Sequence, residues 1–195
     1  MAIIQDGGTG KSAAIDNTAR LSTRSVQQSE TENATDTGDS YNINTGLVTL
    51  TTAGESGVFY LSTNVNKNVH IDSVVVIMGP STGGSATDTT RIRFYRNPTA
   101  GTLISGASAV DDNENRNFGS SKVLDSTAYK GAEGNTITDG AVIIESLVSP
   151  GSRVAFSIDL VLTKGDAIAV SLEPNDSNTS MKTMVAAVLH VEPNI

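Results

Sequence analysis

Alternating hydrophobic residues in the last third of the chain constrain its fold more than any other feature. Between residues 153 and 162 every second position is apolar: Val154, Phe156, Ile158, Leu160 and Leu162. A period of two places these side chains on one face of a β-strand, whereas a helix needs a period near 3.6. Further apolar runs occupy residues 141–148, 167–172 and 181–191. This third of the chain therefore predicts four strands joined by turns.

The preceding part of the chain shows a similar pattern. Apolar runs bounded by turn residues predict four more strands, at residues 41–51, 57–65, 69–78 and 90–96. Residues 74–78 form a solid apolar block, which is typical of a strand covered on both faces. No stretch has a sustained helical period, so we expect no helix. About eight antiparallel strands with long cross-connections predict an all-β antiparallel sandwich of the jelly-roll type.

Composition agrees with a strand-rich fold. Gly, Ser, Thr, Asn and Asp are abundant while good helix formers are sparse, a balance that favours strands joined by turns. The 195 residues suffice for one domain with a real core plus an extension. Aromatic residues make up only 4% of the chain and there is no tryptophan. We therefore expect a core of Val, Ile, Leu and Ala.

The chain divides by composition near residue 40. Residues 1–40 are polar and aperiodic, and 29–40 are acidic and hydroxyl-rich, so we expect an extended arm and linker. Residues 41–195 form the predicted sandwich. Within it, residues 106–136 have only isolated apolar positions, and a loop of this length is usually functional. We predict that this loop contacts a partner through Asp111, Asp112, Arg116 and Phe118.

Charge and cysteine content exclude several classes of protein. The formal net charge of −8 argues against nucleic-acid binding, which needs clustered Lys and Arg. Arg91 and Arg93 would share one face of a strand. We favour the interpretation that this face is exposed to solvent, and the alternative is an anionic contact on a partner. The absence of cysteine excludes disulfides and thiolate metal sites and suits folding in a reducing cytoplasm. The sequence has neither a secretory signal nor an apolar run that could span a bilayer, so we expect no membrane partner.

Gly10, Lys11 and Ser12 match the end of a phosphate-binding P-loop. That motif needs another glycine five positions before Gly10, where this chain has Gln5. It also needs a buried strand before the loop and a helix after it, and the sequence predicts neither. We therefore expect no bound nucleotide and no other cofactor.

Two short motifs fill the first 26 residues: IQDGGTGKSAAIDN at residues 4–17 and RLSTRSV at residues 20–26. This opening resembles that of many tailed-bacteriophage virion proteins, which begin with a D-G-x-G-x-G/K segment and an A-x-V/I-D-x-x-x-R-L stretch before a β domain. The resemblance implies an arm that lies on, or threads between, neighbouring subunits of the head surface, neck or tail. It implies partner-binding residues in the arm: Ile4, Asp6, Gly7, Gly8, Gly10, Lys11, Ile15, Arg20, Leu21 and Arg24.

The segment LTKGDAIAV at residues 162–170 predicts two strands joined by a turn, in which Gly165 supplies a positive φ. It resembles the strand, Lys-Gly-Asp turn, strand hairpin of jelly rolls of the C1q and tumour-necrosis-factor type. The aromatic-rich core of those families is not visible in this chain. The resemblance implies a homo-oligomer, with a trimer favoured.

The sequence also suggests three other kinds of site, a calcium loop, a histidine metal site and a hydrolase site, and each has a simpler explanation. Asp111, Asn113 and Asn115 have EF-hand spacing, but Arg116 and Lys122 replace the required glycine and glutamate, so a solvated loop is favoured over calcium. The two histidines, at positions 70 and 190, would bind a metal only if they were adjacent with a carboxylate beside them. A Ser-His-Asp hydrolase would need a G-x-S-x-G elbow, which is absent. We therefore predict no metal site and no enzyme activity.

Two function classes remain. The first is a structural component of a tailed-phage virion: a capsid decoration, neck or tail-surface subunit made in the host cytoplasm, whose partners are other phage structural proteins. The alternative is a receptor- or carbohydrate-binding sandwich of a phage fibre. Sugar sites commonly stack on exposed Trp or Tyr, and this chain has only four tyrosines. That shortage favours the structural role.

Overall fold

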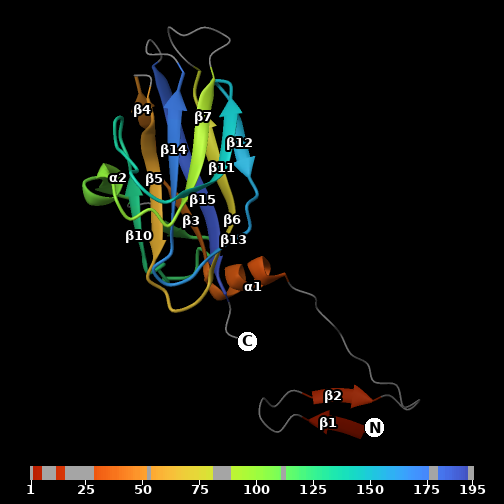
Figure 1. Ribbon diagram of the computed structural model, residues 1–195. Coiled ribbons are helices and arrows are strands. Elements are labelled where there is room, and N and C mark those ends of the chain that lie inside the picture. The colour runs from red at the N-terminus through yellow and green to blue at the C-terminus, as the bar shows by residue number, and fades with distance from the viewer. Residues whose placement is uncertain are drawn as a thin grey trace.

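The computed structural model describes residues 2–5, 12–15, 29–51, 54–80, 89–110, 113–175 and 180–192. Residues 29 onward contain two antiparallel sheets of six and seven strands, packed as a sandwich (Figure 1). The predicted all-β sandwich is therefore confirmed, with thirteen strands in the two sheets instead of about eight. The additional strands are short ones that pair at the sheet edges or arise where one predicted run breaks into two.

Six strands form the first sheet. In order across it they are β11 (Ala141–Val148), β7 (Thr90–Arg96), β14 (Ala167–Pro174), β5 (Ser56–Thr63), β10 (Ser126–Lys130) and β8 (Ser108–Ala109). Four of them, β5, β7, β11 and β14, coincide closely with predicted runs. The two strands at one side, β10 and β8, come from the segment that was predicted to be a loop.

Seven strands form the second sheet. Across it lie β12 (Arg153–Phe156) and β13 (Leu160–Leu162), then β6 (Val69–Met78), β15 (Met181–Val191), β3 (Ser40–Asn44) with β4 (Val48–Leu50), and finally β9 (Asn113–Asn115). The predicted run at residues 153–162 is interrupted between β12 and β13, where Asp159 has a positive φ of 34°. The two halves pair with successive parts of β6.

The chain order across the sheets is that of a jelly roll. The chain alternates between the sheets along β5, β6 and β7, and again along β12–β13, β14 and β15. When β12 and β13 are counted as one strand and the insertion is left aside, the step from β7 to β11 is the one between β5 and β15 that stays within one sheet, and these two strands pair directly. The long insertion between β7 and β11 supplies β8, β9 and β10. Every described strand pair is antiparallel, as a jelly roll requires.

The main core fills the space between the sheets with aliphatic side chains and few aromatic ones. Phe59, Phe94 and Ile71 are among its fully buried members. Phe94 of β7 meets Phe156 of β12 edge to face, with ring centroids 4.8 Å apart. The expected, mainly aliphatic core is thus confirmed. The two sheets pack against each other through the alternating apolar side chains seen in the sequence.

The expectation of two-sided cover at residues 74–78 is not met within this chain. Val74, Val76 and Met78 are buried, whereas Val75 and Ile77 lie on the opposite face of β6 and stay partly exposed. In the strand register Val75 is opposite Ala186, and Ile77 is opposite Met184. In the described part of the chain, the outward side of the seven-stranded sheet therefore carries apolar cross-strand pairs that are only partly buried.

A helix, α1 (Glu30–Thr37), occupies the segment that was expected to be an irregular linker. Ser29 and Glu32 form a capping box at its start, and Gly38 ends it with φ +76°. Its single buried side chain, Ala34, rests where the helix contacts β3 and β15. The sequence did not predict this helix because the segment has no helical period of apolar residues. One buried apolar residue and good caps are enough to stabilise a short helix when it packs against the end of a sheet.

The long insertion at residues 106–136 is more ordered than expected. It contains β8, β9 and β10, and β10 pairs with β5 along five residues. Just before it lies the short helix α2 (Thr102–Ser105), whose Leu103 is fully buried. Together with Tyr60, Tyr95 and Ala169, Leu103 forms a second small core on the outer side of the six-stranded sheet.

The resemblance at residues 162–170 implied a hairpin, and that part is wrong. The strand β13 pairs with β6, whereas β14 pairs with β5 and β7, so the turn crosses from one sheet to the other. Gly165 does adopt the predicted positive φ, at +84°. Asp166 holds this turn by accepting hydrogen bonds from the Thr163 amide at 2.9 Å and its hydroxyl at 2.6 Å. These bonds, led by the one from the Thr163 hydroxyl, lower the pKa of Asp166.

Candidate functional site

Only two of the predicted arm residues lie within the described part of the chain. Ile4 belongs to β1 (Ala2–Gln5) and Ile15 to β2 (Ser12–Ile15), and the two strands pair antiparallel as a hairpin. The other eight, Asp6, Gly7, Gly8, Gly10, Lys11, Arg20, Leu21 and Arg24, lie outside the described residues. A strand at Ser12–Ile15 stands where a P-loop would begin its helix, which agrees with the rejection of that motif.

The loop residues differ in what they contact. Asp111 and Asp112 lie outside the described residues. Arg116 is used within the chain: its guanidinium lies 3.3 Å from the Ser40 hydroxyl, and its amide donates to the Ser40 carbonyl at 2.9 Å. Phe118 is fully exposed. Of the two predicted loop residues that the structure describes, Phe118 is the one that projects freely into solvent.

Two of the positions in the EF-hand spacing, Asn115 and Lys122, form contacts within the chain. The side-chain nitrogen Nδ2 of Asn115 donates to the carbonyl of Gly38 at 2.7 Å, and its side-chain oxygen Oδ1 accepts from the backbone amide of Asn117 at 2.9 Å. Lys122, at the position of the closing glutamate, forms an ion pair with Asp39 at 2.9 Å. These polar groups fasten the insertion to the segment that follows α1 instead of facing an ion.

The two histidines, distant in the sequence, meet on adjacent strands. His70 of β6 and His190 of β15 are paired in register, and their rings stack with centroids 4.8 Å apart and planes 10° apart. Asp72 lies beside them, with Oδ1 2.9 Å from Nδ1 of the buried His190. That contact lacks hydrogen-bond geometry, so both ring nitrogens of His190 are without a hydrogen bond.

This cluster resembles neither a metal centre nor a hydrolase site. A face-to-face ring stack does not aim both imidazoles at one ion, and the described residues contain no group of three potential ligands arranged for a metal. Ser40 is opposite His190 in the register, but its hydroxyl lies 3.4 Å from the Leu189 carbonyl and accepts from Arg116. No hydrogen bond between a serine and either histidine occurs in the described chain.

A charged network covers the outer face of the six-stranded sheet. Arg93 of β7 lies between Glu55, at 2.6 Å, and Glu145 and Glu173, each at 3.3 Å. Burial alone would lower the pKa of Arg93, but the three carboxylates outweigh it and raise that pKa. The partner-facing arginine patch considered from the sequence is therefore already neutralised within the chain.

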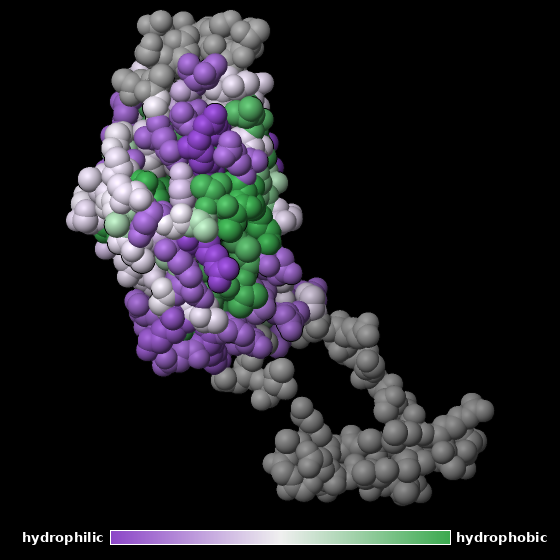
Figure 2. All heavy atoms as spheres, viewed as in Figure 1, coloured by the Kyte–Doolittle hydropathy of each residue, from purple (hydrophilic) through white to green (hydrophobic). Residues whose placement is uncertain are grey.

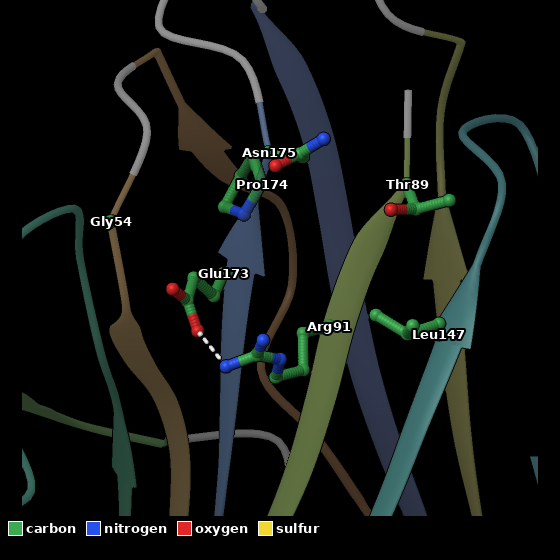
Figure 3. A pocket seen from close by; sticks show the side chains of 7 residues that line it. All are labelled: Gly54, Thr89, Arg91, Leu147, Glu173, Pro174 and Asn175. Atoms are coloured by element: carbon green, nitrogen blue, oxygen red, sulfur yellow. Dashed lines mark hydrogen bonds and ion pairs between the residues drawn. The ribbon is translucent and has the colours of Figure 1, made fainter. Parts of the chain in front are cut away.

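Glu55 also organises the tyrosine and serine beside it. The hydroxyls of Tyr95 and Ser171 both donate to Oε1 of Glu55, the latter at 2.5 Å. Burial raises the pKa of Tyr95, and the bond to Glu55 with its charge raises it further. Next to this network is a pocket of about 330 Å³ lined by Gly54, Thr89, Arg91, Leu147, Glu173, Pro174 and Asn175 (Figure 3). Arg91 within it is held by Glu173 at 3.2 Å and Glu145 at 3.4 Å.

One side of the sandwich is apolar where both sheets end. We call this surface the apolar flank and define it by its exposed side chains: Val142, Ile143 and Leu147 of β11, and Val161 of β13. Figure 2 shows a continuous hydrophobic area over β11, β12 and β13. A groove of about 300 Å³ separates the two sheets here, lined by Ile143, Leu160 and Val161 among others. The sequence showed these residues as apolar but could not show that two edge strands lie side by side.

Most tyrosines are unavailable for stacking on a sugar. Tyr41, Tyr60 and Tyr95 are buried, and the partly buried Tyr129 stacks on Tyr60 with ring centroids 5.7 Å apart. A carbohydrate platform on the tyrosines therefore has no support in this arrangement.

No helix in the described part of the chain has the length and hydrophobicity needed to cross a bilayer.

Comparison with protein families and with curated proteins gives no match to this sequence. Among solved structures, the chain is similar to a mitogen derived from Yersinia pseudotuberculosis, with a TM-score of 0.35 and 13% identity over 79% of this chain and 88% of that one. It is also similar to a chain in the structure of infectious bursal disease virus Gt strain, with a TM-score of 0.16 and 11% identity over 80% of this chain and 40% of that one. Neither likeness bears on function.

Proposed function

We propose that the protein is a structural component of a tailed-phage virion, a capsid decoration, neck or tail-surface subunit. Residues 1–40 include the anchoring arm, and the sandwich at residues 41–195 associates with copies of itself, as a trimer by its resemblance to C1q-like jelly rolls. The proposed partners are other phage structural proteins. Such a protein works by assembly and needs neither a cofactor nor catalysis.

The apolar flank is the observation that carries this proposal. Two of its exposed apolar side chains, Ile143 of β11 and Val161 of β13, line the same groove, as apolar side chains do on surfaces that bind other proteins. Several polar side chains, among them Glu55 and Asn115, form hydrogen bonds within the chain. An exposed apolar surface on a folded body suits protein-protein contact.

Incorporation into particles tests the anchoring role. Full-length protein and a variant lacking residues 1–28 are each mixed with particles that lack this protein, and bound protein is measured after sedimentation. The deletion keeps Ser29, so the capping box of α1 remains intact. We expect full-length protein to bind and the deletion variant to stay in solution while its circular dichroism is unchanged. Equal binding by both proteins would rule out the arm as the anchor, and no binding by either would refute the virion role.

A receptor-binding module of a phage fibre is the alternative, and one observation favours it. Phe118 and Val123 project strongly into solvent from the insertion near α1, which is a typical arrangement for a contact loop. Binding of the protein to host cells, compared with a Phe118→Ser variant, tests this alternative. Saturable binding that the substitution removes would favour the receptor role over the purely structural one.

A further inference from the structure

The two histidines of the chain, at positions 70 and 190, face one another across two long strands of the seven-stranded sheet. The strands β6 and β15 share nine residue pairs, more than any other two strands in the described part of the chain. The imidazole rings stack with their centroids 4.8 Å apart. A repulsion between these rings would therefore act on the most extensive strand pairing of the sheet.

A β-bulge brings a carboxylate to the same place. The register shifts between Val188 and Leu189 of β15, which leaves Asp72 of β6 without an opposite residue. Bulges commonly redirect a side chain in this way. Oδ1 of Asp72 lies 2.9 Å from Nδ1 of His190. The bulge thus places one negative charge beside the stacked rings.

The cluster is also poorly satisfied in hydrogen bonds. Both ring nitrogens of His190 and Oδ2 of Asp72 are the buried side-chain atoms that have no hydrogen bond in the described part of the chain. Unpaired buried polar atoms destabilise a fold, so their persistence calls for an explanation. Burial costs a charged group far more than a neutral one. A charge added to His190 would therefore have only the carboxylate of Asp72 to compensate it.

The neighbouring strands bring apolar or positively charged groups to this row of the sheet. Ser40 of β3 is opposite His190, and the Arg116 guanidinium lies 3.3 Å from the Ser40 hydroxyl. Val161 of β13 is opposite His70 on the other side. Along this row of described residues, the charge that the flanking strands contribute is therefore positive.

Other charged groups on the adjoining elements are engaged elsewhere or face solvent. Asp39, before β3, is paired with Lys122 at 2.9 Å, and Glu192, after β15, accepts from Asn68 at 2.8 Å. Lys67, before β6, donates to the Glu192 carbonyl at 3.3 Å. The acidic side chains of α1, which contacts β3 and β15, and the one that precedes β13 are exposed: Glu30, Glu32, Asp36 and Asp159. Among the described residues, one carboxylate thus serves two imidazoles.

We propose that the two histidines form an acid-sensitive switch, which weakens the pairing of β6 with β15 when both imidazoles are protonated. Asp72 balances the first proton. The second proton places two positive charges on rings stacked 4.8 Å apart, one of them buried, with Arg116 as a third positive charge close by. Like charges at this distance repel, and burial limits the screening by water and salt. This switch belongs to the folded chain alone, so it holds or fails independently of the virion role.

The direction of the effect follows from a comparison with the unfolded chain. There the two histidines are far apart, and each takes up a proton near about pH 6.5. In the folded chain the first proton opposes the second, so the unfolded chain binds more protons in mild acid. The free energy of unfolding is therefore greatest above about pH 7 and falls as the pH drops towards about 5.

Urea unfolding of the full-length protein tests the switch, at about pH 7.5 and about pH 5, on either side of the range in which imidazoles titrate. The variant His70→Phe keeps a ring against His190 but cannot take up a proton. The matched control is Val161→Phe, which adds an aromatic ring at the position opposite His70 and leaves both histidines in place. Asp72→Asn removes the counter-charge. Circular dichroism follows the unfolding of each protein.

We expect the unfolding constant of the wild type and of Val161→Phe to rise about tenfold or more between the two pH values, and that of His70→Phe to rise less than about threefold. Asp72→Asn should lose more stability than the wild type over the same interval. An unfolding constant of the wild type that does not change with pH, or a His70→Phe variant that loses stability as steeply as the wild type, would overturn the proposal.

Proton nuclear magnetic resonance of the wild type gives a second measurement that does not depend on any variant folding. The chain has two histidines and no cysteine, so the ring-proton signals in this pH range belong to this pair. We expect the pair to titrate in two steps separated by more than about one pH unit, because each charge affects the other. Two superimposed titration curves would show that the rings do not interact and would refute the switch.

Discussion

A close approach of two backbones fastens the long insertion to the sandwich, and Gly131 is the residue that permits it. A methyl group added at Gly131 would lie 1.8 Å from the Gly57 carbonyl oxygen and 2.9 Å from Cδ1 of Leu103. Non-bonded carbon and oxygen atoms stay beyond about 3 Å, so the backbones would have to separate by more than about 1 Å. The hydrogen bond from the Gly131 amide to the Val58 carbonyl, 3.0 Å long, lies at the same point.

These numbers predict the cost of Gly131→Ala. Losing the hydrogen bond costs about 1 kcal/mol. Overpacking against Leu103 costs a further ~1–3 kcal/mol. A total near 3 kcal/mol lowers the melting temperature of a domain of this size by about 6–12 °C. Thermal unfolding followed by circular dichroism measures the change.

Gly119→Ala is the matched control within the same insertion. A methyl group there meets only the Asn117 side-chain oxygen, at 3.4 Å, and should leave the melting temperature unchanged within about 1 °C. If Gly131→Ala melts together with the wild type and Gly119→Ala, the insertion is not fastened at this point and the argument from backbone proximity is wrong.

Three further perturbations follow from the structure. Glu55→Gln should lower the free energy of unfolding by about 1–2 kcal/mol, after allowance for solvent screening. It should also lower the pKa of Tyr95, because the charge of Glu55 helps to raise that pKa, and an unchanged tyrosine absorbance titration would contradict this. Leu103→Ala should cost about 2–4 kcal/mol in urea unfolding, since Leu103 is the buried centre of the second core, and a loss under about 1 kcal/mol would contradict it. The hydrogen bonds from Thr163 lower the pKa of Asp166 in the folded protein, so its charge stabilises the fold above about pH 4 and that contribution is lost as the pH falls. Asp166→Asn should therefore be less stable than the wild type at pH 7, and the difference in the free energy of unfolding should shrink as the pH falls below about 4. A difference that does not change with pH would refute the assignment.

The strands that the sequence predicted well are those with a strong local pattern. The expected runs at residues 69–78 and 90–96 coincide with β6 and β7, and the run at residues 141–148 coincides with β11. Each is long and apolar enough that local preference and burial agree. The break between β12 and β13 was not predicted because the positive φ of Asp159 leaves the alternation of apolar residues in the sequence unchanged.

Elements that depend on distant neighbours were missed. The helix α1 has few apolar residues and weak helix formers, and only contact with β3 and β15 makes burial of Ala34 worthwhile. The strand β10 has little alternation of its own and is held by pairing with β5. Both cases show tertiary contact deciding the conformation of a segment whose local preference is weak.

Some features of the candidate site could also be predicted from the sequence, and others could not. Chemistry that the sequence lacks, such as cysteine ligands or a complete P-loop, could be excluded from residue types and spacing alone. The apolar residues of the flank were also visible in the sequence, in the runs at residues 141–148 and 153–162. What the sequence could not show is which strands end a sheet, because edge position follows from pairing between segments that lie far apart in the chain.

Alternation of side chains is a local property of the backbone, and so the sequence by itself determined an all-β sandwich with an aliphatic core. Strand order, the meeting of His70 with His190, and the joining of β11 with β13 at one apolar flank depend on long-range pairing. Such pairing is selected by the burial of whole sheet faces, a quantity that belongs to the assembled domain and to no single segment.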